Sequence, residues 1–273
     1  MQLEFAKMHG LGNDFMIVHW PDEIGEPSPE RVRALADRRR GVGFDQLLLV
    51  GALSAGRDRA SYRVFNADGG EVEQCGNGVR CVASFLASAP GEKLSLTSLG
   101  GTIEAELLED GFVTVSFGEP DFRPSSLPFE APRRSDRYRL TLDAGEAVFG
   151  AVSIGNPHIV IEVDSVDEAP VGILGSELAA HRNFSQGVNV GFMQCDDREH
   201  VRLRVFERGV GETRACGTGA AAAVAVGRSW GRLAEDVAVR LPGGTLRVSW
   251  PGPGAPLWQT GPATKVYEGR IEL

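Results

Sequence analysis

The sequence predicts an α+β protein with two pseudo-twofold-related domains, each with its strands wrapped around a central helix. Three observations predict this fold class. One sequence pattern occurs twice, which indicates an internal duplication. Short segments of alternating apolar and polar residues dominate both halves, as is typical of strands. Each half also contains one longer apolar segment with the spacing of a buried helix.

The repeated pattern aligns without a gap at an offset of 141 residues. The two copies are RVFNADGGEVEQCGNG at 63–78 and RVFERGVGETRACGTG at 204–219. Two more pairs follow in the same order at an offset of 143, namely Gly12-Asn13 with Gly155-Asn156, and Gln46 with Asn189. Ordered matches at nearly one offset indicate a duplicated domain, and each copy of the pattern supplies one cysteine.

A proline-rich stretch separates the two copies. Residues 118–136 contain prolines at positions 120, 124, 128 and 132 and little apolar periodicity, which is typical of an interdomain crossing. We therefore expect an N-terminal domain over residues 1–118 and a C-terminal domain over residues 119–262. The final residues, 263–273, alternate like a strand that packs back onto the N-terminal domain.

The remaining elements follow from local periodicity. Helices are expected from near Asn77 to Leu86 and from near Thr218 to Gly227, because Asn77 and Thr218 are suitable N-cap residues. Both helices should be buried. Period-two alternation predicts strands at 15–18, 47–50, 62–65, 102–107, 113–117, 139–142, 147–154, 159–163, 190–193, 201–206, 237–241 and 246–250.

Composition excludes several classes of function. The chain of 273 residues carries a net charge of −9, which argues against nucleic acid as a partner. No apolar run approaches the length of a membrane span, and the N-terminus has no signal-peptide pattern, so we expect a cytoplasmic protein without a membrane partner. The cysteines have no zinc-ligand spacing, and we expect Cys81 and Cys195 to be inert.

Cys75 and Cys216 are the candidates for chemistry. Each directly precedes a predicted helix, where the unpaired N–H groups and the helix dipole favour a thiolate and lower the thiol pKa. The same N–H groups would bind a carboxylate. If the two copies face each other, one thiolate can remove an α-proton from one face while the opposing thiol donates to the other. This geometry predicts an amino-acid epimerase that inverts one carbon.

At these residues the sequence resembles the diaminopimelate epimerase family. The first family signature is similar to residues 66–78. These read Asn66-Ala-Asp-Gly-Gly, then a spacer of four residues, then Cys75-Gly-Asn-Gly, with Gly70 in place of the family's serine. The second signature is complete from Glu207 to Gly219, and the opening motif matches at His9–Phe15. The resemblance implies a cofactor-independent enzyme that interconverts LL- and meso-diaminopimelate for lysine and peptidoglycan synthesis, without pyridoxal phosphate or metal, and a homodimer.

The resemblance also implies roles for individual residues. Cys75 and Cys216 would be the acid–base pair, and His158 and Glu207 would tune the thiols. By position, the substrate would be held by Asn13, Gln46, Asn66, Gly76, Asn77, Asn156, Asn189, Glu207, Arg208, Gly217 and Thr218. Without the resemblance, His158 could equally be a core histidine, and Glu207 and Arg208 a surface pair.

Alternative functions remain open from the sequence. A proline-racemase-like enzyme would share the paired thiols, although Gly76-Asn77 differs from the Gly-His that usually follows the first cysteine in proline racemases. A dithiol redox switch and a nonenzymatic amino-acid binding module are the alternatives from other classes. Deuterium incorporation from solvent at the substrate α-position would separate an epimerase from a redox switch.

Overall fold

The computed structural model describes residues 2–131, 133–142 and 145–273. These residues divide into two compact units, one formed by Met1–Val115 with Gly261–Leu273 and the other by Ser116–Thr260. Pro132, which belongs to the predicted proline-rich crossing, lies outside the described residues. Both units are mixed α and β, and the predicted α+β fold class with two repeated domains is confirmed.

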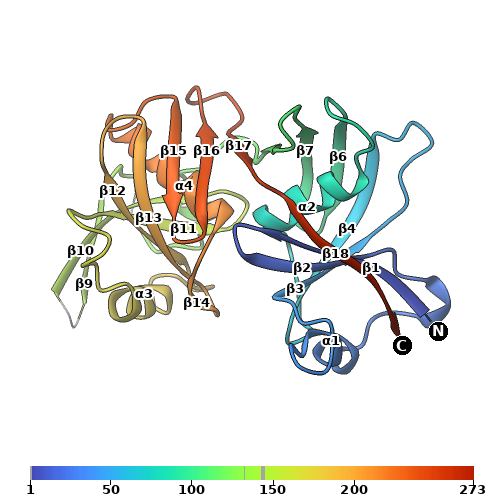
Figure 1. Cartoon of the computed structure of the whole chain (residues 1–273). Helices are drawn as coiled ribbons and strands as arrows, with labels where there is room; N and C mark the ends of the chain where they lie inside the picture. The colour runs from blue at the N-terminus through green and yellow to red at the C-terminus, as the bar shows by residue number, and fades with distance from the viewer. Residues whose placement is uncertain (1, 132, 143–144) are drawn as a thin grey trace. The chain divides into compact units, whose positions relative to one another are not determined.

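The first unit holds the strands and helices at both ends of the chain (Figure 1). Strand β18 pairs antiparallel with β1, although the two strands are the last and the first of the sequence. In chain order, its elements are β1 Gln2–Gly10, β2 Asn13–Val18, α1 Pro29–Ala36, β3 Gln46–Val50, β4 Arg59–Asn66, β5 Glu71–Val72, α2 Gly76–Leu86, β6 Lys93–Ser98, β7 Gly101–Leu107, β8 Val113–Ser116 and β18 Thr264–Glu272, with a short 3-10 turn at Asp22–Ile24.

The second unit repeats this order of strands and helices. After a 3-10 turn at Pro124–Ser126, its elements are β9 Tyr138–Leu142, β10 Gly145–Ser153, β11 Pro157–Glu162, α3 Val171–Ala179, β12 Asn189–Cys195, β13 His200–Glu207, β14 Gly211–Thr213, α4 Gly217–Ser229, β15 Asp236–Leu241, β16 Gly244–Ser249 and β17 Trp258–Gly261. Figure 1 shows α2 and α4 lying among the strands of their own units.

The strand pairings of the two units also correspond. The hairpin β1–β2 corresponds to β10–β11, and the parallel pair β2–β3 corresponds to β11–β12. The register is also the same. Phe15 pairs with Gln46 in the first unit, and His158 pairs with Asn189 in the second. Each residue of the second pair lies 143 positions after its counterpart in the first pair. The duplication read from the sequence is therefore present in the backbone.

An ion pair is repeated along with the strands. Arg63 Nε lies 2.8 Å from Glu71 Oε1, and Arg204 Nε lies 2.7 Å from Glu212 Oε1. The exposed part of these side chains limits the contribution of each pair to stability to about 1 kcal/mol or less. Their recurrence at one offset shows that the β4–β5 and β13–β14 turns are built in the same way.

Small residues allow the central helix of the second unit to be buried all round. Every residue from Gly217 to Gly227 is buried in α4, which packs against β10, β11, β12 and β16. A Cβ added at Gly150 on β10 would lie 2.5 Å from Val226, and one at Gly227 would lie 2.4 Å from Leu233. Glycine at these positions therefore lets the helix approach its neighbours closely.

The predicted caps of the two central helices are wrong by two residues. The N-caps are Cys75 and Cys216 themselves, both in extended conformation, and Asn77 and Thr218 occupy the second helical position. Asn77 and Thr218 point instead to polar groups of neighbouring strands. The cysteines thus lie at the helix start itself and not two residues before it.

Two shorter helices were not predicted from the sequence. Helix α1 did carry a usable signal, since Ser28 is its N-cap, Pro29 is its first residue, and Ser28 Oγ accepts a hydrogen bond from the Arg31 N–H. Helix α3 begins after Pro170 without a side-chain cap, so its start carried no such signal. Strand β1, which begins the chain, was also missed.

Each unit has an apolar core of its own. In the first unit, buried side chains from β1, β2, α1, β3 and β4 form one cluster. In the second, aromatic rings dominate, and Phe129 stacks on Phe184 with ring centroids 4.7 Å apart.

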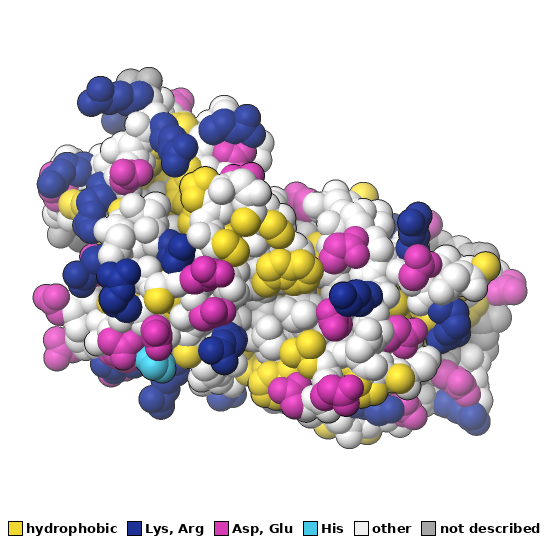
Figure 2. All heavy atoms as spheres, turned by 90° about the horizontal axis from the view of Figure 1, so that it is seen from above, with side chains coloured by type: hydrophobic (Ala, Val, Ile, Leu, Met, Phe, Trp, Pro, Cys, Tyr) yellow, Lys and Arg dark blue, Asp and Glu magenta, His cyan; other side chains and the backbone are white. Residues whose placement is uncertain are grey.

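Among the residues that the structure describes, no helix is long and apolar enough to cross a membrane. Acidic and basic side chains are interspersed on the face shown in Figure 2.

Candidate functional site

Cys75 begins helix α2 and is half-buried. Its Sγ donates to Asn13 Oδ1, at the start of β2, at a distance of 3.5 Å. The same oxygen accepts a hydrogen bond of 3.4 Å from Asn77 Nδ2. The first intrahelical bond is donated by Val79, so the N–H groups of residues 76–78 precede the helical ladder. Three residues predicted to act together, Asn13, Cys75 and Asn77, therefore meet within one unit.

The orientation of the Asn13 amide is determined by a carboxylate. Its Nδ2 donates to Asp45 Oδ2 over 3.1 Å, and an ionised carboxylate only accepts hydrogen bonds. The amide oxygen must therefore face Cys75 and Asn77. Asp45 was not among the residues predicted from the sequence, because its role depends on a contact between β2 and the loop before β3.

Asp45 belongs to a charged network that the sequence analysis missed. Arg38 Nη2 lies 2.7 Å from both Asp14 Oδ1 and Asp45 Oδ1, and Lys7 Nζ lies 2.6 Å from Asp14 Oδ2. Lys7, which is buried, also donates to the Gly43 carbonyl. Burial opposes ionisation of Asp14, but hydrogen bonds from Arg38 and Lys7 outweigh it and hold the Asp14 pKa well below its usual range.

A second polar pair of the first unit joins Gln46 and Asn66. Gln46 Nε2 donates to Asn66 Oδ1 over 2.8 Å, across the register pair that links β3 to β4. The other amide atom, Gln46 Oε1, is buried and has no hydrogen-bond partner among the described residues. The turn after Asn66 closes normally with Gly70 in the serine position, since Asn66 N donates to Gly70 O over 2.8 Å. A buried unpaired acceptor of this kind fits a donor supplied by a ligand.

Cys216 begins helix α4 and is buried, with 4% of its surface exposed. Its Sγ lies 3.7 Å from Thr218 Oγ1. Burial, followed by the charge of Glu207, raises the pKa of Cys216 well above its ordinary value. The expectation that its helix position lowers the pKa of this thiol is therefore wrong, because desolvation outweighs the helix start.

Glu207 ends strand β13 close to this thiol. Burial raises the pKa of the Glu207 carboxyl above its ordinary value, and hydrogen bonds from Thr213 and Cys216 act in the opposite direction. The Thr213 hydroxyl donates to Glu207 Oε1. Glu207 is thus a carboxyl with a raised pKa that is hydrogen-bonded to the Cys216 thiol.

His158 lies beneath the start of α4 and is 1% exposed. Its Nε2 is 3.0 Å from Asn156 Oδ1 and 3.0 Å from Thr218 Oγ1. Burial, together with the charge of Arg208, lowers the pKa of His158 to about 3. The ring is therefore neutral at physiological pH and positions the Asn156 amide and the Thr218 hydroxyl, as the Asp45 network positions Asn13 in the first unit.

Arg208 and Asn189 form the last predicted group. Asn189 Oδ1 accepts from the Arg208 backbone N–H over 2.9 Å, and the Arg208 guanidinium donates to Gln186 O over 2.7 Å. A Cβ at Gly187, where φ is 69°, would lie 2.9 Å from Arg208 Cδ, so this turn requires glycine. The guanidinium is thus held at a loop with donors left for a planar anion.

Glycines leave room beside both thiols. A Cβ added at Gly78 would lie 3.3 Å from Cys75 Cβ, and one at Gly219 would lie 3.2 Å from Cys216 Sγ. The carbonyl of Gly217 accepts a hydrogen bond from Gln259 Nε2 over 2.7 Å.

Within the part of the chain that the structure describes, no group of three or more His, Cys, Asp or Glu side chains is placed to hold a metal ion.

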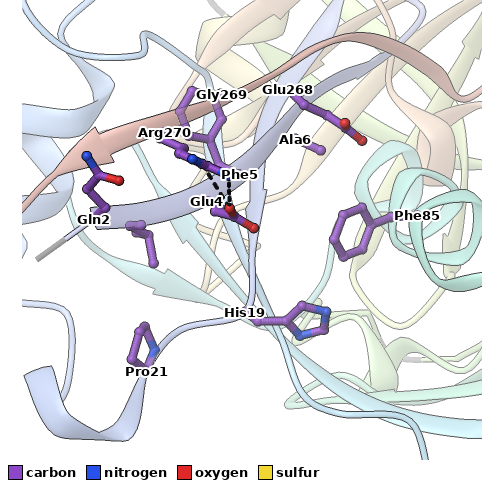
Figure 3. A pocket seen from close by; sticks show the side chains of 11 residues that line it. Gln2, Glu4, Phe5, Ala6, His19, Pro21, Phe85, Glu268, Gly269 and Arg270 are labelled. Atoms are coloured by element: carbon purple, nitrogen blue, oxygen red, sulfur yellow. Dashed lines mark hydrogen bonds and ion pairs between the residues drawn. The ribbon is translucent and has the colours of Figure 1, made fainter.

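One hollow of the first unit lies away from these residues (Figure 3). It has a volume of about 630 Å³ and is lined by side chains of β1 and β18 together with His19, Pro21 and Phe85. The Glu4–Arg270 ion pair crosses its wall, with 2.8 Å between Nη2 and Oε1. None of the predicted site residues lines this hollow, and we do not place the chemistry there.

Comparisons with known proteins identify the family and the fold of the chain. The sequence model of the family described as diaminopimelate epimerase matches residues 5–123 and 150–266, which include both cysteines. One similar solved structure is a hydroxyproline epimerase from Agrobacterium vitis with bound trans-4-OH-L-proline, at 17% identity and a TM-score of 0.70, covering 100% of this chain and 93% of that chain.

Two further solved structures extend the range of similar proteins. A phenazine biosynthesis protein of the PhzF family from Bacillus anthracis is 17% identical with a TM-score of 0.65, and the match covers 100% of both chains. A methylitaconate-delta-isomerase is 14% identical with a TM-score of 0.67, covering 99% of this chain and 95% of that chain. At these identities the likeness shows the fold alone.

Proposed function

Since this chain belongs to the diaminopimelate epimerase family, we propose that it interconverts LL- and meso-diaminopimelate. The observation that carries the proposal is the repeated placement of Cys75 and Cys216 as N-caps of two buried helices. A thiol and a set of backbone N–H groups occur together at each helix start. This combination supplies an acid–base group and a carboxylate-binding group at the same place.

The proposed reaction is a proton exchange at one carbon. A cysteine thiolate takes the α-hydrogen as a proton and becomes a thiol, and the electron pair of the C–H bond moves toward the carboxylate. Backbone N–H groups at the helix starts stabilise the charge that develops there. The other cysteine thiol then donates its proton to the opposite face of the carbon and becomes a thiolate. No electron is gained or lost, and the two cysteines have exchanged their protonation states.

Polar groups in the two units support a substrate that is charged at both ends. Gln46 Oε1 is a buried acceptor that an ammonium group would satisfy. Arg208, positioned through Gln186, offers a guanidinium for a carboxylate. The duplication partner of Arg208 is Ala67, so only one half carries this cation. We infer that the second half receives the distal carboxylate.

Glu207 and His158 have supporting roles in this proposal. The Glu207 carboxyl, with its raised pKa, would accept or return the proton of Cys216. Neutral His158 would hold Asn156 and Thr218 in place beside the thiol. The proposal includes no metal or pyridoxal phosphate, and it extends to a cytoplasmic location and a homodimer.

The deciding experiment follows hydrogen exchange by proton NMR. LL-diaminopimelate is incubated with the reduced protein in deuterium oxide. We expect loss of an α-proton signal and growth of the meso isomer. Cys75→Ala and Cys216→Ala should each slow this by about a hundredfold or more, because each removes one of the two proton-transfer groups.

Cys195→Ala is the matched control, since Cys195 lies on β12 away from both helix starts, and it should retain most of the turnover. No deuterium incorporation by the reduced protein would instead favour the redox switch or the binding module. Near-normal turnover in either of the first two variants would rule out the two-thiol mechanism.

A further inference from the structure

The buried residues near the two thiols differ, although the helices that the thiols begin are duplication partners. At the offset of 141, Tyr62, Arg80 and Cys81 of the first unit correspond to Leu203, Ala221 and Ala222 of the second. All six side chains are buried. At these three positions the first unit therefore has a phenol, a guanidinium and a thiol, whereas the second unit has only apolar side chains.

Arg80 is fully buried in helix α2 and contacts both residues that follow Cys75. Its Nη2 donates to Asn77 Oδ1 over 2.7 Å, and its Nη1 donates to the Gly76 carbonyl over 3.2 Å. Nε donates to the Pro262 carbonyl over 3.4 Å. These three acceptors carry no formal charge, and the contacts fix the orientation of the guanidinium.

The charge of Arg80 acts on the thiols of its own helix. Burial lowers the pKa of Arg80 to about 10, and interaction with Cys81 and Cys75 acts in the opposite direction. The group therefore stays protonated at neutral pH. Burial raises the pKa of Cys81 to about 12, so that thiol stays neutral. Of these two neighbours, half-buried Cys75 is the one that can ionise beside Arg80.

The other groups around Cys75 oppose its ionisation weakly. Tyr62 on β4 is neutral, because burial raises its pKa to about 12. Asn13 accepts from the thiol, which favours the protonated form, but a thiol is a weak donor. The carboxylates beyond Asn13 are paired with cations, since Asp14 contacts Lys7 and Arg38, and Asp45 contacts Arg38.

We propose that Arg80 is a positioning residue that favours the thiolate of Cys75, so that Cys75 ionises before Cys216 in the resting protein. Cys216 has the contrary surroundings, namely an alanine-rich helix and the carboxyl of Glu207. This inference rests on the proposed function, in which one cysteine starts as thiolate and the other as thiol. It adds that, starting from the resting protein, Cys75 is the base that removes the α-proton and Cys216 is the acid that donates a proton.

The test measures each thiol separately and needs no substrate. The reduced protein is alkylated with iodoacetamide at a series of pH values, and the rate at each cysteine is read by peptide mass spectrometry. We expect the midpoint for Cys75 to lie at least about one pH unit below that for Cys216. The midpoint, unlike the absolute rate, does not depend on how accessible a thiol is. Equal midpoints, or a lower midpoint for Cys216, would overturn the inference.

Variants then assign the effect to Arg80. Arg80→Met should raise the Cys75 midpoint by about one unit or more and slow its alkylation at neutral pH about tenfold. Arg80→Lys keeps the charge and should restore most of the shift. Arg59→Met, which removes an exposed arginine of the same unit, is the matched control and should leave the midpoint unchanged.

The outcomes separate this inference from the proposed function. An unchanged Cys75 midpoint in folded Arg80→Met would overturn the role of Arg80, even if the wild-type protein is an active epimerase. If Arg80→Met does not fold, the wild-type midpoints and Arg80→Lys decide. A shifted midpoint without epimerase activity would keep the role of Arg80 and refute the proposed reaction.

Discussion

At the scale of single residues, Arg208 is the side chain on which substrate choice depends in our proposal. It follows Glu207 directly, and its backbone N–H is held by Asn189 while its guanidinium contacts Gln186. A site built to bind a carboxylate rejects analogues that lack it, because its own polar groups are then left unpaired. Lysine lacks the distal carboxylate of diaminopimelate, and proline lacks the whole distal end.

Arg208→Met should therefore lower kcat/KM for diaminopimelate by about tenfold to a hundredfold. Wild-type values for lysine and proline should be lower than the diaminopimelate value by roughly 10⁴. Arg182→Met, at an exposed position of the same unit, should leave kcat/KM unchanged. Comparable kcat/KM for proline and diaminopimelate would support a proline-racemase-like enzyme and refute the assigned substrate.

Residue-scale chemistry also shows where a general rule fails. The start of a helix usually lowers a thiol pKa, yet the Cys216 pKa is raised by burial and by Glu207. The rule describes a local dipole, whereas burial is produced by every strand that covers the helix. A sequence motif therefore indicates the helix dipole but not how deeply the thiol is buried.

At the scale of elements, the network of Lys7, Asp14, Arg38 and Asp45 joins β1, β2 and the loop between α1 and β3. It orients Asn13 toward Cys75. Asp14 has a folded-state pKa below its ordinary value of 3.8, so its stabilising contribution is present above that value and is lost as the pH falls below it.

Asp14→Asn should accordingly reduce the free energy of unfolding by about 2 kcal/mol at neutral pH. The difference from the wild type should shrink as the pH falls from about 4 toward 2. Urea unfolding at pH 7, 5, 4 and 3 measures this, with Glu109→Gln at an exposed turn as the control. A difference that is independent of pH would mean that the charge of Asp14 is not what stabilises the network.

At the scale of the whole molecule, the proposed reaction requires two thiols from different units to reach one carbon. Each unit is compact and supplies one thiol with its own polar neighbours. The requirement is testable without substrate, because two thiols that can reach one carbon can also be joined by an oxidant.

We expect mild oxidation to inactivate the protein and dithiothreitol to restore activity. Peptide mapping should find a Cys75–Cys216 disulfide in the oxidised sample. Cys81→Ala should behave like the wild type, because Cys81 is fully buried in the helix interior. A linkage of Cys75 to Cys81, or full activity after oxidation, would contradict the proposed approach of the two thiols.

Much of the fold was readable from local pattern. The repeated RVF segments, the paired cysteines and the apolar runs after them predict the duplication and the two central helices, and the register of Phe15 with Gln46 and His158 with Asn189 reproduces the predicted offset. These features depend on residues close together in the chain. Helix α3 was missed because its start has no capping side chain.

The sequence by itself determined the duplication, the α+β fold class and the cysteines that begin the helices, because each can be recognised from short sequence segments. Only the tertiary structure decided the surroundings of the thiols. It brought Asp45 to Asn13, buried Arg80 beneath Cys75 and covered Cys216 until its pKa rose. Hydrogen-bond orientation and desolvation depend on groups distant in the chain, and no local pattern states them.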